Sequence, residues 1–386
     1  MIEGWRLSTW GDEISLEYGK AIRGYKDAVA PYRVFGSNGP IGWSEKALAQ
    51  GPGVILGRKG AYRGVHYSPD PFFVIDTAYY LKPKSDLDMR WLYYAIIHHK
   101  LGEIDDGSPI PSTTRAAVYV RDVEVPPLPE QRAIAATLGA LDDKIELNRK
   151  MNATLEAMAR ALFRDWFVDF GPTRAKMEGR APYLSPDLWP LFPDRLDDEG
   201  KPEGWELRPV GDFAELKGGK QLEKKHIADT GPVPVFGGAG LMGYTTNHNA
   251  DGFVISVGRV GAYCGQFFSH RGKAWINNNA SLIRPNSDVS GEWLLIALRH
   301  IDMDVIKKGA AQPFVSNGDI AKVGIMWPGT AIISAFSEAL VSLMRKAEAN
   351  ERESRTLAQT RDLLLPRLMS GELRVAEAES LTANTV

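Results

Sequence analysis

The strongest constraint on this chain is that it repeats itself after about 200 residues. Gly-Trp-Arg-Leu at 4–7 returns as Gly-Trp-Glu-Leu at 204–207, Val-Phe-Gly at 34–36 returns at 235–237, and Trp-Leu at 91–92 returns at 293–294. A solenoid repeats every 20–50 residues, whereas a period this long is the size of a domain. The sequence therefore predicts two copies of one domain in tandem.

Each copy has the same internal order. Short β-type runs broken by glycine and proline come first, one helical stretch interrupts them, and a long helical pattern closes the copy. We therefore expect an α+β fold with two tandem-repeat α/β domains and two long helices. The expected boundaries are domains at 1–129 and 205–330, long helices at 130–170 and 331–370, a connector at 171–204 and a tail at 371–386. We expect the tail to be frayed from about Arg374 to Val386.

The two long helical patterns have the same heptad spacing. Ten positions from Ile134 to Trp166 step by four and three residues, and each returns 202 residues later, between Phe336 and Leu368. This 3.5-residue period is typical of a coiled-coil seam. We expect the helices to pack on each other antiparallel, as a spacer with a pseudo-two-fold axis between the domains. The alternative is that each helix packs only on its own domain.

Polar residues in the heptads predict the register. An alignment in which paired residue numbers sum to 502 places Asn148 against Ser354, Asn152 against Asn350, Leu155 against Ala347 and Trp166 against Phe336. A polar layer fixes register at some cost in stability. The same alignment sets Leu141 against Arg361, its weakest layer, and we expect Pro366 to kink or end the second helix.

Composition excludes several classes of protein. The single cysteine, Cys264, excludes an internal disulfide and a cysteine-rich zinc site, and the scattered histidines predict no metal site. Without a signal peptide or an apolar run near the ~18 residues of a membrane span, we expect a cytoplasmic protein without membrane contact. A net charge of −2 is low for a protein that binds nucleic acid alone, so a partner would supply much of any phosphate contact.

Two motifs resemble catalytic signatures but are better explained otherwise. The glycines at 238, 240 and 243 match a dinucleotide fingerprint, yet no helical sequence follows, and the first copy has glycines in the same register. Pro193-Asp194 with Glu199-x-Lys201 resembles a nuclease pattern, but it lies in a polar connector where such residues are common. We therefore expect no catalytic residue.

Both copies keep glycine-rich loops with polar side chains. The candidate DNA-binding residues are Ser37, Asn38, Arg58, Lys59, Tyr62, Arg63, Ser112, Thr113, Thr114, Arg115, Arg259, Tyr263, Asn277, Asn278, Asn279, Gln312, Ser316 and Asn317. Arginine and lysine suit guanine or phosphate, and asparagine or glutamine suits adenine. Equivalent positions differ, for example Lys59 and Val260, which favours a split, asymmetric DNA target. The alternative is that these loops are ordinary turns.

Four segments resemble a known family. The run from Leu128 to Glu156 (LPEQRAIAATLGALDDKIELNRKMNATLE) resembles the central conserved helix of type I restriction-modification specificity subunits. LFRDWFVDF at 162–170, FPDRL at 192–196 and LLPRLMSGEL at 364–373 are similar to further segments of that family. The resemblance covers essentially the whole chain.

The resemblance implies a non-catalytic subunit for DNA specificity. Each domain would be a target recognition domain for one half of a bipartite sequence in double-stranded DNA, and the helices would be the spacer. Two adenine methyltransferase subunits would bind S-adenosylmethionine, and restriction subunits would use ATP and Mg²⁺, while this chain would bind no cofactor or metal. A stand-alone methyltransferase or nuclease is disfavoured by the missing motifs. A coiled-coil scaffold or a degenerate specificity subunit without DNA readout remains the alternative.

Overall fold

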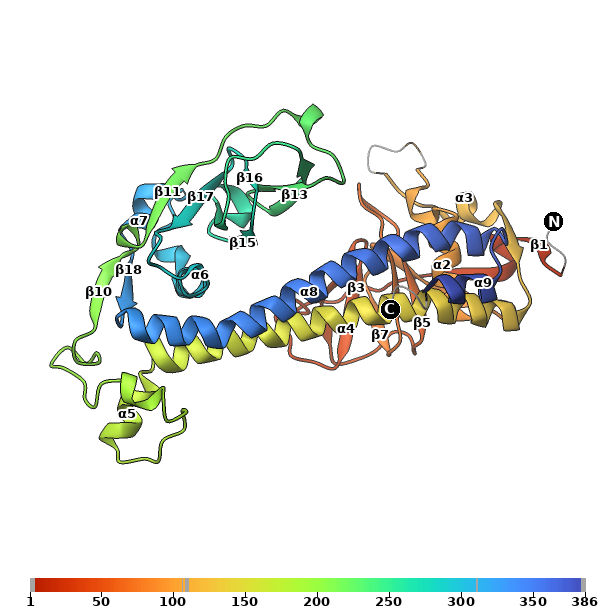
Figure 1. Ribbon diagram of the computed structural model, residues 1–386. Helices are drawn as coiled ribbons and strands as arrows, with labels where there is room; N and C mark the ends of the chain where they lie inside the picture. Colours follow the sequence, from red (N-terminus) through yellow and green to blue (C-terminus); the bar gives the residue numbers. More distant parts are fainter. Residues whose placement is uncertain (1–3, 106, 108–110, 310–311, 383–386) are drawn as a thin grey trace. The chain divides into compact units, whose positions relative to one another are not determined.

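The chain divides into two compact units, each containing one β-rich domain. The computed structural model describes residues 4–105, 107, 111–309 and 312–382. Unit 1 contains Met1–Arg149 and Asn350–Val386, and unit 2 contains Lys150–Ala349. Each unit therefore includes a section of both long helices, α4 (Leu128–Phe167) and α8 (Thr330–Met369) (Figure 1).

The domain of unit 1 is built from short strands and short helices. It contains β1 (Arg6–Thr9), α1 (Trp10–Glu13), β2 (Ile14–Tyr18), β3 (Tyr32–Gly36), β4 (Gly39–Ser44), β5 (Gly53–Gly57), β6 (Val65–Ser68), β7 (Phe72–Val74), β8 (Ala78–Pro83), α2 (Met89–His98), η1 (Leu101–Glu103), α3 (Arg115–Tyr119) and β9 (Asp122–Val125). The strands form three sheets in the orders β2-β8-β5-β6, β4-β3-β7 and β1-β9.

In unit 2, the connector that follows α4 holds α5 (Gly171–Met177) and η2 (Trp189–Leu191). The domain of unit 2 contains β10 (Glu206–Pro209), η3 (Val210–Asp212), β11 (Ala214–Gly218), η4 (Lys224–His226), β12 (Val233–Gly237), β13 (Gly240–Thr245), β14 (Phe253–Gly258), η5 (Gly261–Tyr263), β15 (Phe267–Arg271), β16 (Trp275–Ile276), β17 (Ala280–Pro285), α6 (Gly291–His300), η6 (Met303–Val305), α7 (Asn317–Ala321) and β18 (Gly324–Trp327).

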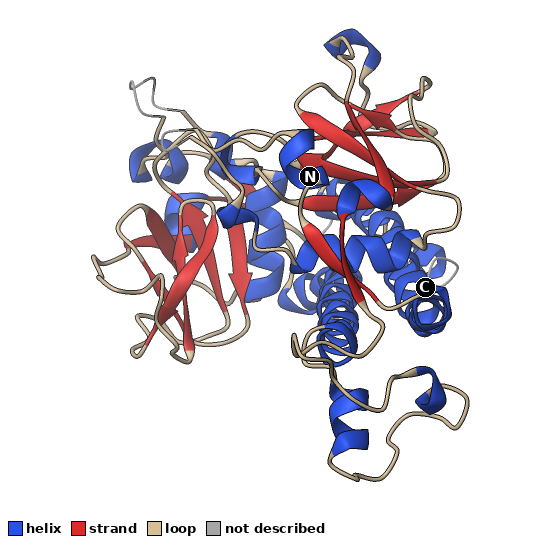
Figure 2. Cartoon of the chain, turned by 90° about the vertical axis from the view of Figure 1, so that its left-hand side faces the viewer, coloured by secondary structure: helices blue, strands red, loops and turns tan. Residues whose placement is uncertain are grey.

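The sheets of unit 2 repeat the topology of unit 1. Their orders are β11-β17-β14-β15, β13-β12-β16 and β10-β18. Figure 2 shows the strands in red and the helices in blue. In each three-stranded sheet one pair is parallel, β3 with β7 and β12 with β16. Both units even share a register shift, after Val34 in one and Val235 in the other. The predicted α+β fold with a duplicated domain is therefore confirmed.

A buried tryptophan helix organises each core. In unit 1, α2 packs on β5 and β6, and Trp91 is fully buried. In unit 2, α6 packs on β14, β15 and β17, and Trp293 is equally buried. Both helices begin at a side chain that accepts backbone N–H groups, Asp88 in unit 1 and Ser290 in unit 2.

The sections of α4 and α8 pack antiparallel within each unit. In unit 1 the buried Asn148 donates from Nδ2 to Ser354 Oγ at 3.3 Å and to Glu353 Oε2 at 2.8 Å. In unit 2 the rings of Trp166 and Phe336 lie 5.6 Å apart. Both pairings, Asn148 with Ser354 and Trp166 with Phe336, are those of the proposed alignment.

The remaining predicted polar residues also face the partner helix or the interior. Asn152 donates to the carbonyl of Ala347 at 3.2 Å in unit 2, one turn from its proposed layer. Asn350 is buried in unit 1 and its carbonyl accepts from Asn148 at 3.4 Å. The polar amides thus contact helix backbone as well as side chains.

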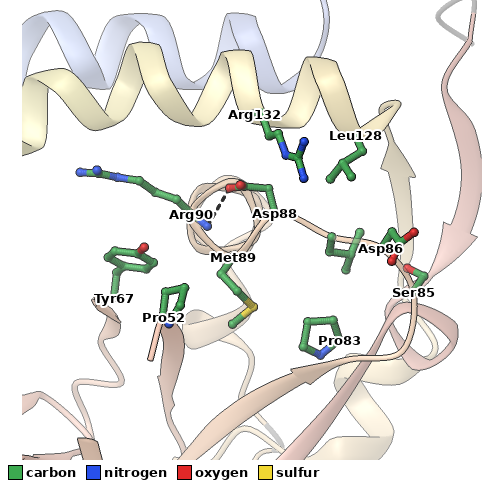
Figure 3. Close-up of a pocket in the computed structure, with 11 residues that line it drawn as sticks. Pro52, Tyr67, Pro83, Ser85, Asp86, Asp88, Met89, Arg90, Leu128 and Arg132 are labelled. Atoms are coloured by element: carbon green, nitrogen blue, oxygen red, sulfur yellow. Dashed lines mark hydrogen bonds between the residues drawn. The ribbon is translucent and has the colours of Figure 1, made fainter. Parts of the chain in front are cut away.

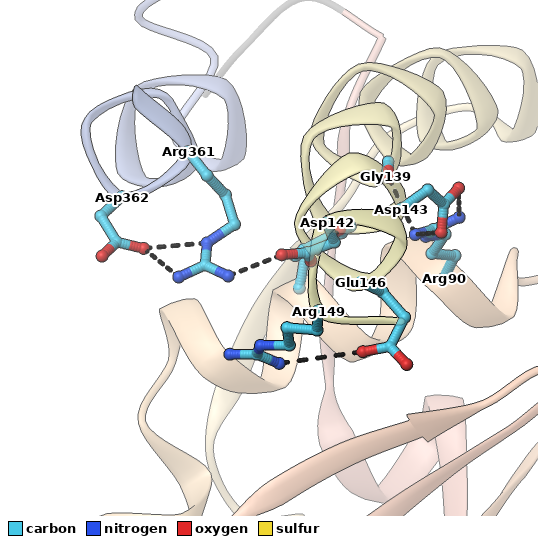
Figure 4. A network of polar contacts seen from close by, with 9 residues as sticks. Arg90, Gly139, Asp142, Asp143, Glu146, Arg149, Arg361 and Asp362 are labelled. Atoms are coloured by element: carbon cyan, nitrogen blue, oxygen red, sulfur yellow. Dashed lines mark hydrogen bonds and ion pairs between the residues drawn. The ribbon is translucent and has the colours of Figure 1, made fainter. Parts of the chain in front are cut away.

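In the layer that places Leu141 against Arg361, the arginine forms an ion pair. Leu141 is buried, whereas Arg361 turns its guanidinium to Asp142 at 2.6 Å (Figure 4). Tyr94 donates its hydroxyl to the same carboxylate at 2.6 Å, and burial raises the pKa of that phenol. The charge is therefore removed from the apolar layer instead of being buried in it.

The structure corrects two expectations for the C-terminal part. Of the two outcomes expected at Pro366, a kink or an end, the helix does not end there, because α8 continues to Met369. The tail is not frayed throughout, because α9 (Val375–Thr382) follows and Ala378 is fully buried in the core of unit 1. Leu373 joins this core and anchors the start of the segment.

Candidate nucleic-acid interface

In unit 1, the candidate loop follows β5 and is tied to the segment before α3. Two backbone hydrogen bonds connect them: Gly60 N to Pro111 O at 3.0 Å, and Thr113 N to Arg58 O at 2.9 Å. These bonds flank the facing residues Lys59 and Ser112, which form an isolated antiparallel bridge. Since the flanking residues make the hydrogen bonds, this is the closely spaced type of pair, with both side chains on one face.

Unit 2 has the same construction after β14. Gly261 N donates to Pro313 O at 2.9 Å, and Val315 N donates to Arg259 O at 3.0 Å. The facing residues are Val260 and Phe314. We call the two pairs, Lys59–Ser112 and Val260–Phe314, the loop bridges of units 1 and 2.

One predicted DNA-binding arginine is occupied inside its own loop. Arg63 donates to the carbonyls of Gly60, Gly102 and Ile104 at 2.7 to 3.0 Å and to Thr113 Oγ1 at 3.2 Å. Thr113 is fully buried. Because their donors and acceptors brace the loop, neither side chain is offered to a ligand in this structure.

Other predicted polar residues also have structural partners. Thr114 and Ser316 accept backbone N–H groups at the starts of α3 and α7, and Ser37 donates to the carbonyl of Thr77 at 2.6 Å. Asn277 is buried, and its Oδ1 accepts from the N–H of the exposed Asn278. These side chains shape the loops.

Seven of the candidate DNA-binding side chains are exposed. The side chains of Asn38, Lys59, Tyr62, Tyr263, Asn278, Asn279 and Gln312 are exposed. Tyr62 is 78% exposed and Tyr263 50%, although they occupy the same place in the two copies. Both copies thus have an exposed tyrosine at the same position, and packing in the core does not explain this tyrosine.

The remaining arginine in unit 1 belongs to a stacked cluster. The guanidinium groups of Arg58 and Arg115 lie 4.8 and 4.2 Å from the ring centre of Tyr18. Arg115 also donates to the carbonyl of Leu16 at 2.7 Å. The ring of Tyr79 lies 5.1 Å from that of Tyr18, and burial, with a smaller contribution from Tyr18, raises the pKa of Tyr79 to about 12. The positive charge of the cluster comes from its two arginines.

Unit 2 replaces most of this cluster. Gly218 stands in the place of Tyr18, and Asn317 in the place of Arg115. Asn317 Oδ1 accepts from Ser281 Oγ at 2.5 Å. An arginine occurs at the same place in both units, Arg58 in unit 1 and Arg259 in unit 2. The buried Nε of Arg259 has no hydrogen-bond partner among the described residues. The two loops therefore have equal backbones and different charge.

A hairpin tip adjoins each loop. Gly39 and Gly240 adopt φ of +118° and +96°, a region that strongly favours glycine. Each glycine faces a ring, His66 in unit 1 and Phe268 in unit 2. Burial lowers the pKa of His66, so it is neutral at pH 7.

The motifs that resembled catalytic signatures have ordinary structural roles. Gly240 begins the strand β13 instead of a helix. Lys201 pairs with Asp197 and Glu199 at 2.5 and 2.6 Å, while Asp194 pairs with Lys176 at 2.9 Å. The two halves of the nuclease-like pattern thus bind different partners. No cluster of His, Cys, Asp and Glu suited to a metal occurs among the described residues.

A pocket of about 360 Å³ in unit 1 has no catalytic arrangement either (Figure 3). It lies at the start of α2, and its polar residues serve the fold. Ser85 donates to Glu13, Asp88 caps α2, and Arg90 pairs with Asp143 at 2.7 Å.

Within the described part of the chain, no helix is long and apolar enough to cross a membrane.

Comparison with known proteins gives consistent matches over both copies. The family "Type I restriction modification DNA specificity domain" matches residues 26–157 and 202–353. The chain is 26% identical to the type I restriction enzyme HindI specificity subunit of Haemophilus influenzae, over 86% of this chain and 88% of that protein. It is 25% identical to the MjaIX specificity subunit of Methanocaldococcus jannaschii, over 76% and 71% of the two chains.

A solved structure shares the fold. The S subunit of a type I restriction-modification system from M. genitalium superposes with a TM-score of 0.57 at 17% identity, covering 94% of this chain and 96% of that one. The family match covers most of the chain and includes both domains and parts of both long helices. The chain therefore belongs to the type I restriction-modification specificity subunits, the non-catalytic subunits that recognise the DNA target.

Proposed function

We propose that the two domains read the two halves of a split, asymmetric DNA sequence. The observation that carries this proposal is the duplicated loop bridge, in which one backbone frame presents Lys59–Ser112 in unit 1 and Val260–Phe314 in unit 2. Equal frames suit equal docking in the major groove, and different side chains suit different base edges. A palindromic target would not need this difference.

The proposed reading surface is narrower than the full set of polar loop residues. Besides the facing pair Val260–Phe314, it consists of the exposed or partly exposed side chains of Asn38, Arg58, Lys59, Tyr62, Ser112, Arg115, Arg259, Tyr263, Asn278, Asn279, Gln312 and Asn317. Arg63, Thr113, Thr114, Asn277, Ser37 and Ser316 support these loops from behind. Substitution of a supporting residue should therefore loosen a whole loop instead of changing one base preference.

Catalysis in this proposal belongs to partner subunits. Two methyltransferase subunits carrying S-adenosylmethionine would flip and methylate an adenine in each half-site. Restriction subunits using ATP and Mg²⁺ would join the complete cytoplasmic complex. The net charge of −2 agrees with partners that supply phosphate contacts.

The long helices are the proposed docking elements for those partners. Leu147 and Met158 on α4 are each 52% exposed, and Leu363 on α8 is 71% exposed. These apolar side chains are exposed in this chain, so they remain available to a partner subunit. They are the positions where we expect methyltransferase contacts.

The first test is a map of methylated adenines. The chain is expressed with the methyltransferase encoded beside it in a host free of methylation, and modified bases are located by single-molecule sequencing. A split motif with a fixed gap that disappears without this chain is expected. A stable complex that methylates nothing would favour the scaffold or degenerate subunit instead.

The second test concerns the gap. With two domains on one face of the duplex, half-site centres about one helical turn apart are expected. Insertion of one heptad in each long helix adds about 10 Å of helix and should lengthen the gap, leaving both half-sites unchanged. If the insertion altered the bases read, the helices would not act as a spacer.

A further inference from the structure

The loop bridge of unit 2 is apolar where that of unit 1 is polar. Val260 and Phe314 are 44% and 42% exposed, and Tyr263 in the same loop is 50% exposed. The equivalent residues in unit 1 are Lys59, Ser112 and Tyr62. Only the tyrosine is shared, so the difference between the units lies in the facing pair.

The apolar pair is held rigidly in solvent. Phe314 exchanges backbone hydrogen bonds with Lys308, at 2.8 and 2.9 Å, in addition to those that flank the bridge. The ammonium of Lys308 turns away to Asp319 at 2.8 Å, and Asp319 in turn accepts from Ser316. The backbone around both hydrophobic residues is therefore held by hydrogen bonds, with their side chains on one face of the bridge, and the charge of Lys308 is paired.

Loss of this pair would not be expected to empty the core of unit 2. The residues that pack inside the loop are others: Cys264 and Val315 are both buried. Val260 and Phe314 instead point their exposed surface outward from a loop whose counterpart is polar. Their exposure costs free energy in water, which a ligand with an apolar contact surface would recover.

In the major groove, the apolar group of a base pair is the thymine C5-methyl. Because the chain is a DNA target-recognition subunit, we infer that Val260 and Phe314 contact thymine methyl groups in the half-site read by unit 2. This inference rests on the proposed reading of one half-site by each domain. Lys59 and Ser112, which can donate hydrogen bonds, would make no such contact in the other half-site.

The test removes methyl groups from the DNA. Once the methylated motif is known, duplexes are made with deoxyuridine in place of thymine in one half-site at a time, and binding is measured with the assembled methyltransferase complex. Each contacted methyl should be worth about fourfold in Kd. The expected result is a loss in one half-site and unchanged Kd in the other.

Variants assign the effect to the loop bridge. In Val260→Lys with Phe314→Ser, which carries the pair of unit 1, uridine and thymine duplexes should bind equally. The matched control, Lys59→Val with Ser112→Phe, should keep the original response to uridine. A single Phe314→Ala variant, which removes the ring without adding charge, serves if the double variant fails to assemble.

Two results would overturn the inference. One is equal binding of uridine and thymine duplexes by the unchanged complex. The other is a uridine response that persists in both unit 2 variants after they have assembled with the methyltransferase. Absence of any split motif would instead refute the proposed function, before uridine is tested.

Discussion

At equivalent places, the two domains combine the same backbone with opposite side-chain chemistry. In unit 1 the guanidinium groups of Arg58 and Arg115 lie over the ring of Tyr18. In unit 2 the place of that ring is Gly218, in the equivalent strand of an equally ordered sheet. The residues that form the shared cores and the residues that we propose for DNA recognition are thus separate sets, so one set can change while the other stays.

The largest change in stability should come from the buried tryptophan that the two domains have at equivalent positions. Trp91→Ala and Trp293→Ala each remove a fully buried ring from the helix that covers the larger sheet, and each should cost about 3–5 kcal/mol in free energy of unfolding. Urea unfolding of the full chain measures both. Tyr62→Ala, at an exposed position, should change stability by less than about 0.5 kcal/mol. A large difference between the two tryptophan variants would break the equivalence of the frames.

The next prediction concerns the pH dependence of stability, which should differ between the two units. Burial lowers the pKa of His99 to about 4, and its counterpart in unit 2 is Ile301. As pH falls below 6.5 the unfolded chain takes up a proton that the folded His99 refuses, so stability falls between pH 6.5 and 4. The loss from this residue should be about 2 kcal/mol at pH 5.

The control for this pH effect is built into the repeat. His99→Ile should unfold at nearly the same urea concentration at pH 7 but lose less stability on transfer to pH 5. Urea midpoints at both pH values for the two chains give the comparison. An unchanged pH response would show that His99 is not the titrating group.

A third comparison concerns the start of the larger sheet. Unit 1 buries Glu13, whose carboxylate accepts from Arg6, Ser8 and Ser85, and the Arg6 hydrogen bond is the main cause that lowers its pKa to about 2. Unit 2 has Phe213 there, 5.4 Å from Trp293. One copy uses a charged anchor and the other an aromatic one.

Glu13→Gln should cost about 1–2 kcal/mol at pH 7, discounted because Arg6 is half in water. The carboxylate's contribution is complete above pH 4.5 and is lost as pH falls toward 2, since its pKa is depressed in the fold. Thermal unfolding at pH 7 and pH 3 measures this. The difference between variant and parent should shrink at pH 3, and a constant difference would contradict the pairing.

Much of this fold was predictable because its signals are local or repeated. A heptad pattern predicts each of the two 40-residue helices. Glycines at equivalent positions in the two copies mark the turns of the hairpins. The use of individual loop residues was not predictable. Arg63 is a polar loop residue in sequence, yet its partners Gly102 and Ile104 lie 39 and 41 residues away and are backbone carbonyls, which leave no trace in side-chain patterns.

The C-terminal helix was missed for a related reason. Its segment carries small and polar residues, so no apolar period marks it. It is placed by tertiary packing, with Ala378 fully buried. Similarly, Arg361 interrupts an apolar heptad in sequence, and only the position of Asp142 explains how the layer tolerates it.

The smallest expected effect on stability tests whether the stacked cluster can be moved. Gly218→Tyr with Asn317→Arg gives unit 2 the residues of unit 1 beside the shared Arg259. A Cβ at Gly218 would meet Arg259 Nη1 at 3.6 Å, an ordinary contact, so the ring has a cation to cover. Cation–π contacts at such sites are worth about 0.5–1 kcal/mol each, which should offset loss of the hydrogen bond between Ser281 and Asn317. Unfolding free energy should therefore stay within about 1 kcal/mol of the parent.

The added charge should steepen the salt dependence of DNA binding by the assembled complex, by about one unit in the slope of log Kd against log salt concentration. The single Asn317→Arg change, without the ring, is the matched control. A double variant that unfolds readily would mean that the two loops are equal in backbone but not interchangeable in packing.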